Sequence, residues 1–375
     1  MTADSRPSLG AALAGAVATL DPGYFALVMG TGILSVAMRN HGLTVFSDVL
    51  LWLTAFAYVV LIVLNVIRAV WFASALRSDF EDPARGFRFF TFVAGTGVLG
   101  TRLALADHHD TALALLLVAW ISWIILGYVV PWTAVLGRAD RPVIASANGT
   151  WFIWVVASQT VAVLSAALEP TVGTGRRELA LLAVFSWSVG VFLYAAAGIF
   201  VAARMLLYPL RPIDLTPPYW VAMGATAITV LAGARIVQMA DAPMVDATRG
   251  LVAGAAVVFW AFGSWLIPVL VAAGWWRHVV HRIPLRYETT WWSIVFPLGM
   301  YGVAGHYLGT ADDLPVVRAI GENESWAAAA VWALAFAAML WHLVRTLLLR
   351  RGEQDLGPCP TPPDPTRLGS SHPTG

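Results

Sequence analysis

Long apolar stretches recur along almost the whole chain, and short segments that carry most of the charged residues separate them. A helix needs about 20 mainly apolar residues to cross the hydrocarbon core of a bilayer, and each stretch is close to that length. The pattern predicts an all-α integral membrane protein with ten transmembrane helices. Their approximate ranges are 22–40, 48–72, 87–106, 110–135, 148–168, 179–205, 217–238, 249–275, 288–308 and 325–349.

Composition narrows the class of protein. Of the 375 residues, 59% are hydrophobic and 12% are charged, and the mean hydropathy is +0.72, which leaves too little polar surface for a soluble globule. The net charge of +1 argues against nucleic-acid binding. Every basic residue is Arg, so the lysine of an ATP-binding P-loop is absent. The single cysteine, Cys359, can form neither an internal disulfide nor a thiolate metal cluster, and we expect no cofactor and no metal.

The distribution of Arg predicts the topology. An even number of spans places both termini on one side of the membrane, and that side carries 16 of the 23 Arg residues, against 7 on the other. Because basic residues favour the cytoplasm, we expect both termini to be cytoplasmic and the protein to lie in the plasma (inner) membrane. Residues 1–20 then form a cytoplasmic arm, residues 21–350 a ten-helix transport domain, and the Pro-rich residues 351–375 a disordered cytoplasmic tail.

The odd-numbered apolar stretches share an internal repeat. Each opens with two adjacent aromatic residues, and about 60 to 70 residues separate successive pairs, which is the length of a helical hairpin. We number each repeat from the second aromatic residue, which is repeat position 0. The pairs are Tyr24-Phe25, Phe89-Phe90, Trp151-Phe152, Tyr219-Trp220 and Trp291-Trp292.

Small residues and hydroxyls fall into register at three repeat positions. Position 5 holds Gly30, Gly95, Ala157, Ala225 and Pro297; position 6 holds Thr31, Thr96, Ser158, Thr226 and Leu298; position 7 holds Gly32, Gly97, Gln159, Ala227 and Gly299. The even-numbered stretches are bulkier and uniformly apolar, as expected for lipid-facing helices. The simplest architecture is therefore five helical hairpins around a pseudo-fivefold central pore, with the odd helices inside.

Two interpretations of the hydroxyl positions stay open. Small residues in membrane helices usually allow neighbouring backbones to approach, and Ser or Thr commonly donates to a carbonyl of its own helix. Alternatively, the same side chains line the pore and solvate an anion weakly at several sites, as rapid conduction requires. For the second interpretation the candidate contacts are Gly30, Thr31, Gly95, Thr96, Ser158, Gln159, Thr226 and Pro297.

Four segments resemble a known family. The segments "PGYFALVMGTG", "NGTWFIWVVASQTVAVL", "PPYWVAMGATAIT" and "WWSIVFPLGMYGVAGH" are similar to the tellurite-resistance/dicarboxylate transporter family, which includes plant slow anion channels, fungal malate permeases and sulfite efflux proteins. The resemblance runs from about residue 20 to residue 350. It implies ten helices in five hairpins around a central pore, assembled as a homotrimer.

The resemblance also implies a gate. In the family a phenylalanine on the ninth helix plugs the pore, and the matching residue here is Phe296, at repeat position 4. Its equivalents are mostly smaller, and Pro297 next to it removes a backbone donor and favours a kink. The alternative is an ordinary core phenylalanine packed between helices.

Cationic residues follow near the far ends of the odd helices. They are Arg39, Arg102, Arg235 and His306, at repeat positions 14, 12, 15 and 14. A cationic ring at the outer mouth would raise the local concentration of anions. The alternative is that these side chains extend to lipid headgroups, which is common at the ends of spans.

Together these features predict a membrane transport protein for small anions or C4-dicarboxylates, and not an enzyme. Its partners are a small anionic substrate, the lipid bilayer and further copies of itself in a homotrimer, with no nucleic acid. A proton-coupled dicarboxylate or sulfite carrier of the same fold is the alternative, although the odd helices lack the intramembrane acid that a proton relay uses. An intramembrane enzyme is a remote alternative, because the acids lie almost entirely in loops.

Overall fold

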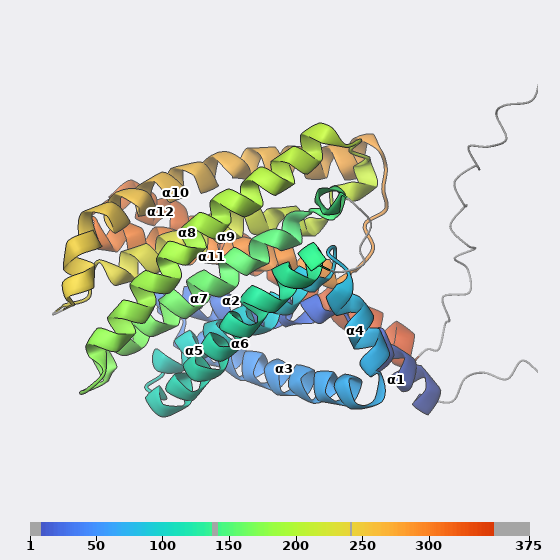
Figure 1. Cartoon of the computed structure of the whole chain (residues 1–375), viewed down its shortest axis with the longest axis horizontal. Coiled ribbons are helices and arrows are strands. Elements are labelled where there is room, and N and C mark those ends of the chain that lie inside the picture. Colours follow the sequence, from blue (N-terminus) through green and yellow to red (C-terminus); the bar gives the residue numbers. More distant parts are fainter. Residues whose placement is uncertain (1–8, 137–141, 241, 349–375) are drawn as a thin grey trace, which may run out of the picture.

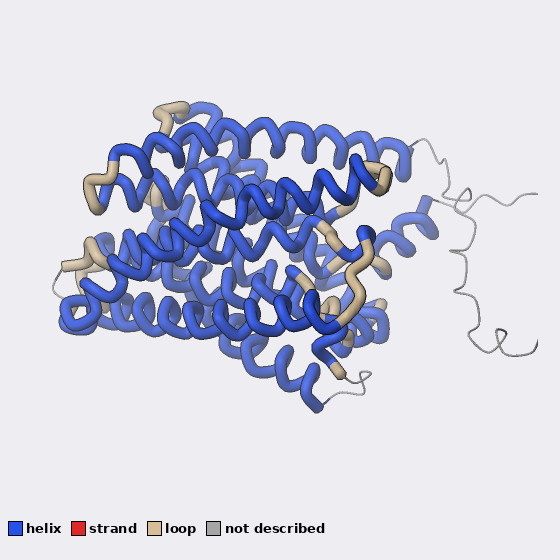
Figure 2. Tube along the Cα trace, turned by 90° about the horizontal axis from the view of Figure 1, so that it is seen from above, coloured by secondary structure: helices blue, strands red, loops and turns tan. Residues whose placement is uncertain are grey.

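The computed structural model describes residues 9–136, 142–240 and 242–348. Within these residues the chain is helical and contains no strand. The long helices run side by side along a common direction (Figures 1 and 2). The predicted tail, 351–375, and the first eight residues of the predicted arm lie outside the described residues.

Five inner helices form the centre of the bundle. Each contacts the next one in chain order, and the last contacts the first, so that the contacts close a ring. A short 3-10 turn precedes each inner helix directly and holds the first aromatic residue of the repeat. The inner helices are α2 (Ala26–Asn40), α5 (Phe90–Ala104), α7 (Phe152–Leu168), α9 (Val221–Ile236) and α11 (Trp292–Ala311).

Local chemistry explains why these helices begin where they do. The Asp21 carboxylate accepts a hydrogen bond from the backbone N–H of Gly23, and the Asn148 side chain accepts one from the backbone N–H of Thr150. Prolines stand in the first turns of the segments before α2 and α9, where a missing backbone donor costs nothing. Each side-chain acceptor satisfies a donor that a helix start leaves unpaired.

Five outer helices surround the ring. Each one packs against the inner helix that precedes it in the chain. They expose large apolar side chains, as a surface that faces lipid should. The outer helices are α3 (Thr44–Trp71), α6 (His109–Leu136), α8 (Arg176–Leu207), α10 (Pro243–Trp275) and α12 (Pro315–Leu343).

The structure supports a multi-pass integral membrane protein. Among the described residues, seven helical stretches are long and apolar enough to cross a membrane: those of the five outer helices and of α7 and α9. The most apolar window of α7 is 94% buried inside the protein, whereas that of α10 is 17% buried. The inner helices α2, α5 and α11 are not among the seven; Gly and Thr interrupt their apolar residues, and they pack against helices on all sides.

The inner and outer helices approach closely where both carry glycine. A Cβ added to Gly321 on α12 would lie 2.7 Å from the carbonyl oxygen of Gly302 on α11, and one added to Gly305 would lie 2.9 Å from the Cα of Gly321. Any side chain at these positions would push the two helices apart. Close packing of this kind provides much of the attraction between helices in lipid, where the hydrophobic effect does not drive association.

Two short helices lie at the end of the bundle where the inner helices begin. They are α1 (Leu9–Ala18) and α4 (Ala73–Glu81). Arg68, near the end of α3, donates to the Asp79 carboxylate of α4 at 2.6 Å and to the last carbonyl of α1 at 3.2 Å. Burial opposes ionisation of Asp79, but hydrogen bonds from Arg68 and Arg85 outweigh it and hold the pKa of this carboxyl below its ordinary value.

Both ends of the described chain lie at the same end of the bundle. Helix α1 contacts the last turn of the described chain, η10 (Val344–Leu348), and the two ends are close together in Figure 1. This arrangement requires an even number of passes along the bundle.

Candidate functional site

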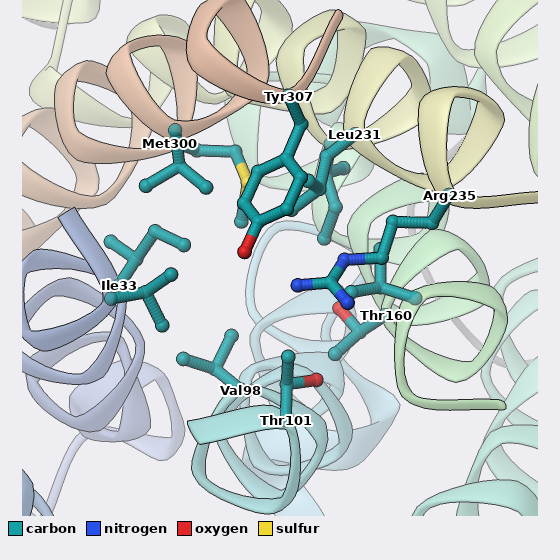
Figure 3. A pocket seen from close by; sticks show the side chains of 12 residues that line it. Ile33, Val98, Thr101, Thr160, Leu231, Arg235, Met300 and Tyr307 are labelled. Atoms are coloured by element: carbon teal, nitrogen blue, oxygen red, sulfur yellow. The ribbon is translucent and has the colours of Figure 1, made fainter. Parts of the chain in front are cut away.

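A cavity at the centre of the ring is lined by all five inner helices, and we call it the axial cavity. Each repeat contributes its residues at repeat positions 8 and 11, and α9 and α11 also contribute repeat position 15. Figure 3 shows these side chains pointing from different helices toward one common space. The lining residues are Ile33, Val36, Val98, Thr101, Thr160, Val163, Ile228, Leu231, Arg235, Met300, Val303 and Tyr307.

Helix geometry explains why these repeat positions meet. With 3.6 residues per turn, successive residues are rotated by about 100°. Repeat positions 4, 8, 11 and 15 therefore share one face of each inner helix, whereas position 6 lies on the opposite face and positions 5 and 7 lie on the flanks. We call the face with positions 4, 8, 11 and 15 the axial face.

A second cavity lies where the inner helices begin, and we call it the mouth cavity. All five repeats contribute to it through repeat position −2, and three of them also through repeat position 1. It is more polar than the axial cavity, because most of its lining side chains carry a hydroxyl or a charge. The lining residues are Asp21, Gly23, Arg88, Thr91, Thr150, Ile153, Pro218, Thr289, Thr290 and Ser293.

Phe296 lies between the two cavities along α11. Ser293 lines the mouth cavity and Met300 lines the axial cavity, and the seven residues from one to the other correspond to a rise of about 10 Å. Phe296 is 1% exposed and belongs to the axial face. Its equivalents in the other repeats are also buried, namely Met29, Ala94, Val156 and Gly224. The largest side chain at this level is therefore the phenylalanine that the sequence singles out.

The hydroxyls at repeat position 6 face the outer helices. The Thr31 hydroxyl accepts a hydrogen bond from the Trp332 indole of α12 at 3.1 Å, and the Thr96 hydroxyl lies 3.0 Å from that of Tyr58 on α3. Ser158 donates to a carbonyl of α8 at 2.8 Å. Thr226 donates to a carbonyl of its own helix at 2.6 Å and lies against α10. These four residues are buried and do not line the axial cavity.

Residues at repeat position 5 lie at the contact between one inner helix and the inner helix before it in the ring. A Cβ on Gly30 would lie 3.1 Å from Val295 of α11, and one on Gly95 would lie 3.4 Å from Val28 of α2. Pro297 in turn packs against Gly224 of α9, where a Cβ would lie 2.9 Å from the proline ring.

Gln159, at repeat position 7, also turns away from the axis. Its amide donates to the Trp187 carbonyl of α8 at 3.1 Å, and its side chain fills the space beside Gly190. The residues proposed from sequence as anion contacts thus hold the helices together in this structure, and their contribution to conduction stays a prediction.

Arg235 is the predicted cationic residue that reaches the axial cavity. Its guanidinium lies 4.3 Å from the centre of the Tyr307 ring, and Figure 3 shows both side chains extending into the cavity. Within the described residues Arg235 makes no ion pair, and its Nε has no hydrogen-bond partner. A guanidinium over an aromatic face keeps its charge and most of its donors available to an anion.

The other predicted cations are placed differently. Arg102 is fully buried and donates to Ser35 and Ser47, at 2.8 and 2.9 Å, and to the Asp48 carboxylate at 2.7 Å. His306 lies 3.3 Å from the Glu322 carboxylate of α12. Arg39 is partly buried at the end of α2. The four residues therefore do not form one ring around the axis.

Sequence reasoning missed most of the axial face. Its lining is mainly Val, Ile, Leu and Met, which look like ordinary core residues in a membrane helix, whereas the hydroxyls are conspicuous in the sequence. The useful signal is the repeat register itself, because a helical period starting at Phe296 reaches repeat positions 8, 11 and 15. Among the described residues, no group of three His, Cys, Asp or Glu side chains could hold a metal ion.

Comparisons with known proteins identify a family and several relatives. The family described as voltage-dependent anion channel matches residues 19–340. An uncharacterised membrane protein of Mycobacterium tuberculosis is 71% identical over 157 residues, which cover 42% of this chain and 80% of that protein. An uncharacterised transporter of Methanocaldococcus jannaschii is 24% identical over 325 residues, or 84% of this chain and 90% of that protein. A sulfite efflux pump of Arthroderma otae is 21% identical over 354 residues, or 87% of this chain and 91% of the pump.

These matches confirm the family predicted from the four sequence segments. The names of the family and of its relatives support anion transport and indicate a transport protein rather than an enzyme. The family match over residues 19–340 covers almost the whole helical bundle, including the five inner helices that surround the two cavities. The chain belongs to the voltage-dependent anion channel family.

Proposed function

We propose that this protein conducts small inorganic anions across the membrane through a pore on the axis of the inner-helix ring. One observation carries the proposal: the same two repeat positions of all five inner helices line a single cavity. Five equivalent helices around one axis define the proposed path, and the outer helices separate this path from lipid. The mouth cavity and the axial cavity both lie on this proposed path.

Phe296 is the gate in this proposal. It lies on the axial face between the two cavities, and both cavities are small. The free space of the axial cavity corresponds to about one water molecule and that of the mouth cavity to one or two. An anion can pass only when the Phe296 ring moves, so the described conformation corresponds to a closed pore.

Electrostatics favour an anion. The five inner helices contain no Asp or Glu, and the Arg235 guanidinium lines the axial cavity without an ion pair among the described residues. Among the described residues that line this cavity, an anion therefore meets one positive charge and no negative charge. The apolar walls contribute few competing hydrogen bonds, which keeps binding weak enough for release.

The size of the cavities favours small inorganic anions over C4-dicarboxylates. A four-carbon diacid is several times larger than the water-sized space around Arg235, and nitrate, chloride or sulfite requires a smaller displacement of the wall. The absence of an acid from the inner helices also favours a channel over a proton-coupled carrier. Sulfite belongs among the test anions because a sulfite efflux pump is a relative.

The finer topology belongs to the same proposal. We propose ten spans in five hairpins, both termini in the cytoplasm, and a homotrimer in the plasma membrane. The Arg distribution and the common location of the two described chain ends support the cytoplasmic termini. The family resemblance supports the trimer, and native mass spectrometry of the purified protein would establish the number of copies.

The experiment is an anion flux assay in proteoliposomes that contain the purified full chain. Nitrate, chloride, sulfite and malate are compared at equal concentration, first with a membrane potential and then with a proton gradient. A flux of small inorganic anions that follows the membrane potential supports the proposal. Transport of malate or sulfite that disappears with the proton gradient would replace it with a coupled carrier, and no flux of any anion would remove it.

A further inference from the structure

The mouth cavity contains a buried hydroxyl that the described part of the chain leaves without a hydrogen bond. Thr150 is 2% exposed and lines this cavity, and within the described residues its hydroxyl has no hydrogen-bond partner. Its backbone N–H is already satisfied by Asn148, at 2.9 Å. A buried hydroxyl without a partner is costly, so its position at a polar cavity points to a ligand that accepts a hydrogen bond there.

A guanidinium faces the same cavity with part of its capacity unused. Arg88 lines the mouth cavity, and its Nε also has no partner within the described residues. Its Nη1 donates to the Asp21 carboxylate at 2.7 Å. Since a guanidinium carries five N–H donors in one plane, Arg88 can contact an anion while its side chain keeps the same direction.

Asp21 occupies the position that an anion would take beside Arg88. Besides the ion pair, its carboxylate accepts a hydrogen bond from the backbone N–H of Gly23 at 2.7 Å and one from the Thr289 hydroxyl at 3.3 Å. These donors come from segments before three inner helices, which all begin around this cavity. The segments around this cavity therefore already direct three donors at one carboxylate.

We propose that the mouth cavity is a second anion-binding site and that Asp21 is a tethered carboxylate that competes with the transported anion for Arg88. The inference rests on the proposed conduction pathway and specifies how an anion enters it. A small inorganic anion accepts hydrogen bonds from Arg88 and from the hydroxyls of Thr150 and Ser293, and Asp21 keeps its cap on Gly23 while it releases the guanidinium. In the absence of the anion the ion pair keeps the cavity near electrical neutrality.

The competition predicts opposite effects for the two members of the ion pair. Asp21→Asn removes the competing charge, yet an asparagine oxygen still caps the backbone N–H of Gly23. It should lower the concentration of anion at half saturation, whereas Arg88→Gln should raise it. The double variant should resemble Arg88→Gln alone, because without the guanidinium there is nothing to compete for.

The test measures binding separately from transport. Nitrate is titrated against the purified full chain carrying Arg235→Gln, so that the axial cavity does not contribute, and gluconate keeps the ionic strength constant. The unfolding temperature at each concentration gives the half-saturation value. We expect a decrease of about fivefold for Asp21→Asn and an increase of about tenfold for Arg88→Gln, the range of a charge-assisted hydrogen bond.

Thr150→Val keeps the test valid if Arg88→Gln does not fold, since valine has the shape of threonine and the lost hydroxyl has no partner in the described residues. It should raise the half-saturation value by about threefold. The control Thr133→Val lies on α6, where the hydroxyl donates to its own helix outside both cavities, and it should leave nitrate binding unchanged.

Two outcomes would overturn the inference. If Asp21 and Arg88 form only a structural ion pair, both single variants lower the unfolding temperature in the absence of nitrate and leave the half-saturation value unchanged. An increase of that value for Asp21→Asn would show that the carboxylate assists binding. If nitrate binds as expected but no anion crosses proteoliposomes of the wild-type chain, the proposed conduction is wrong and the binding site stands.

Discussion

The axial face of the inner helices and the face opposite to it differ in both composition and contacts. The axial face is mainly apolar, and repeat positions 8 and 11 line a cavity. The opposite face carries hydroxyls at repeat position 6 in four of the five repeats, and these face the outer helices. The hydroxyls at repeat position 6 thus lie where protein surrounds them, whereas the space on the axis is lined mainly by apolar side chains, together with Thr101, Thr160, Arg235 and Tyr307.

This difference follows from what each face contacts: the outer helices on one side, and the space on the axis on the other. A hydroxyl that faces the lipid or an apolar neighbour would lose its hydrogen bonds, so the folded chain turns it toward a carbonyl, an indole or a second hydroxyl. An anion on the axis has the opposite requirement, because strong, fully arranged donors would hold it too long. A mostly apolar wall with a single guanidinium, Arg235, meets that requirement.

The variant of the gate residue Phe296 should give the largest change in nitrate flux. We expect Phe296→Ala to raise nitrate flux by about tenfold, which corresponds to a barrier lowered by about 1.4 kcal/mol, because it removes the largest side chain between the two cavities. Flux in proteoliposomes, normalised to the amount of folded protein, measures the effect.

The matched control for the gate is Phe152→Ala. Phe152 is 4% exposed at the start of α7, where it packs against Tyr194 of α8 with 5.3 Å between ring centres. Both variants should lose about 3–5 kcal/mol of stability as buried Phe→Ala changes do. Only the change on the axial face should raise flux, and an equal rise in both variants would mean that loosened packing opens the bundle.

Cysteine labelling compares the two faces directly. In a Cys359→Ser background the chain has no other cysteine. Val98→Cys, at repeat position 8, should react with a small negatively charged thiol reagent, and the reaction should reduce flux by about fivefold because the adduct fills the pore. Thr226→Cys, at repeat position 6, should not react.

The relative labelling rates of the two cysteine variants can contradict the proposed pathway. If Thr226→Cys reacts as quickly as Val98→Cys, the hydroxyl face is reached by water and the axial face is not the only pathway. Combining each cysteine with Phe296→Ala should accelerate labelling of Val98→Cys when the reagent is added from the mouth side, since the gate then no longer separates the cavities.

Arg235→Gln should have a smaller effect that depends on salt. We expect nitrate flux to fall by about threefold at roughly 10 mM salt and less at 150 mM, because the Debye length shortens from about 30 Å to about 8 Å and the attraction between Arg235 and nitrate is screened. Flux measured at the two ionic strengths checks this.

Arg102→Gln serves as the control for Arg235→Gln. Arg102 is also a cation near the end of an inner helix, but it is fully buried and paired with Asp48. Its loss should lower the unfolding temperature, since the guanidinium also donates to the buried hydroxyls of Ser35 and Ser47, which then lose that donor. The ion pair itself contributes little, because the Asp48 side chain is 54% exposed. The flux per folded molecule should not change with salt. A salt-dependent loss in this variant would place Arg102 on the pathway.

Much of the fold could be predicted from the amino-acid sequence. The apolar stretches and the aromatic pairs mark the five inner helices, because each stretch must satisfy its own backbone hydrogen bonds in lipid. Membrane character and family therefore follow from the order of residues alone. The lengths of α2 and α5, 15 residues each, are harder to predict, since the preceding 3-10 turns continue the same apolar pattern.

The direction in which each side chain points was harder to predict. Helix geometry places Thr31 and Ile33 on different faces of α2, but the sequence alone does not say which face turns toward the axis. That choice depends on partners far away in the chain, such as Trp332, which lies 301 residues from Thr31. Arg235 and Arg102 illustrate the same limit, because of these two only Arg102 forms an ion pair with an acid among the described residues.

The variants at repeat position 6 should give the smallest effect on nitrate flux, and they test most directly which face of the inner helices the anion contacts. Thr31→Val removes the acceptor for the Trp332 indole and should cost about 1 kcal/mol, the usual range for a hydrogen bond between membrane helices. Because repeat position 6 faces away from the axis, nitrate flux per folded molecule should change by less than about twofold. The matched change on the axial face is Val163→Thr, which adds a hydroxyl to the lining of the axial cavity and should alter the preference between nitrate and chloride. If Thr31→Val alters that preference while Val163→Thr does not, the anion is solvated by the hydroxyls of the repeat, and the pore runs along the face that this structure packs against the outer helices.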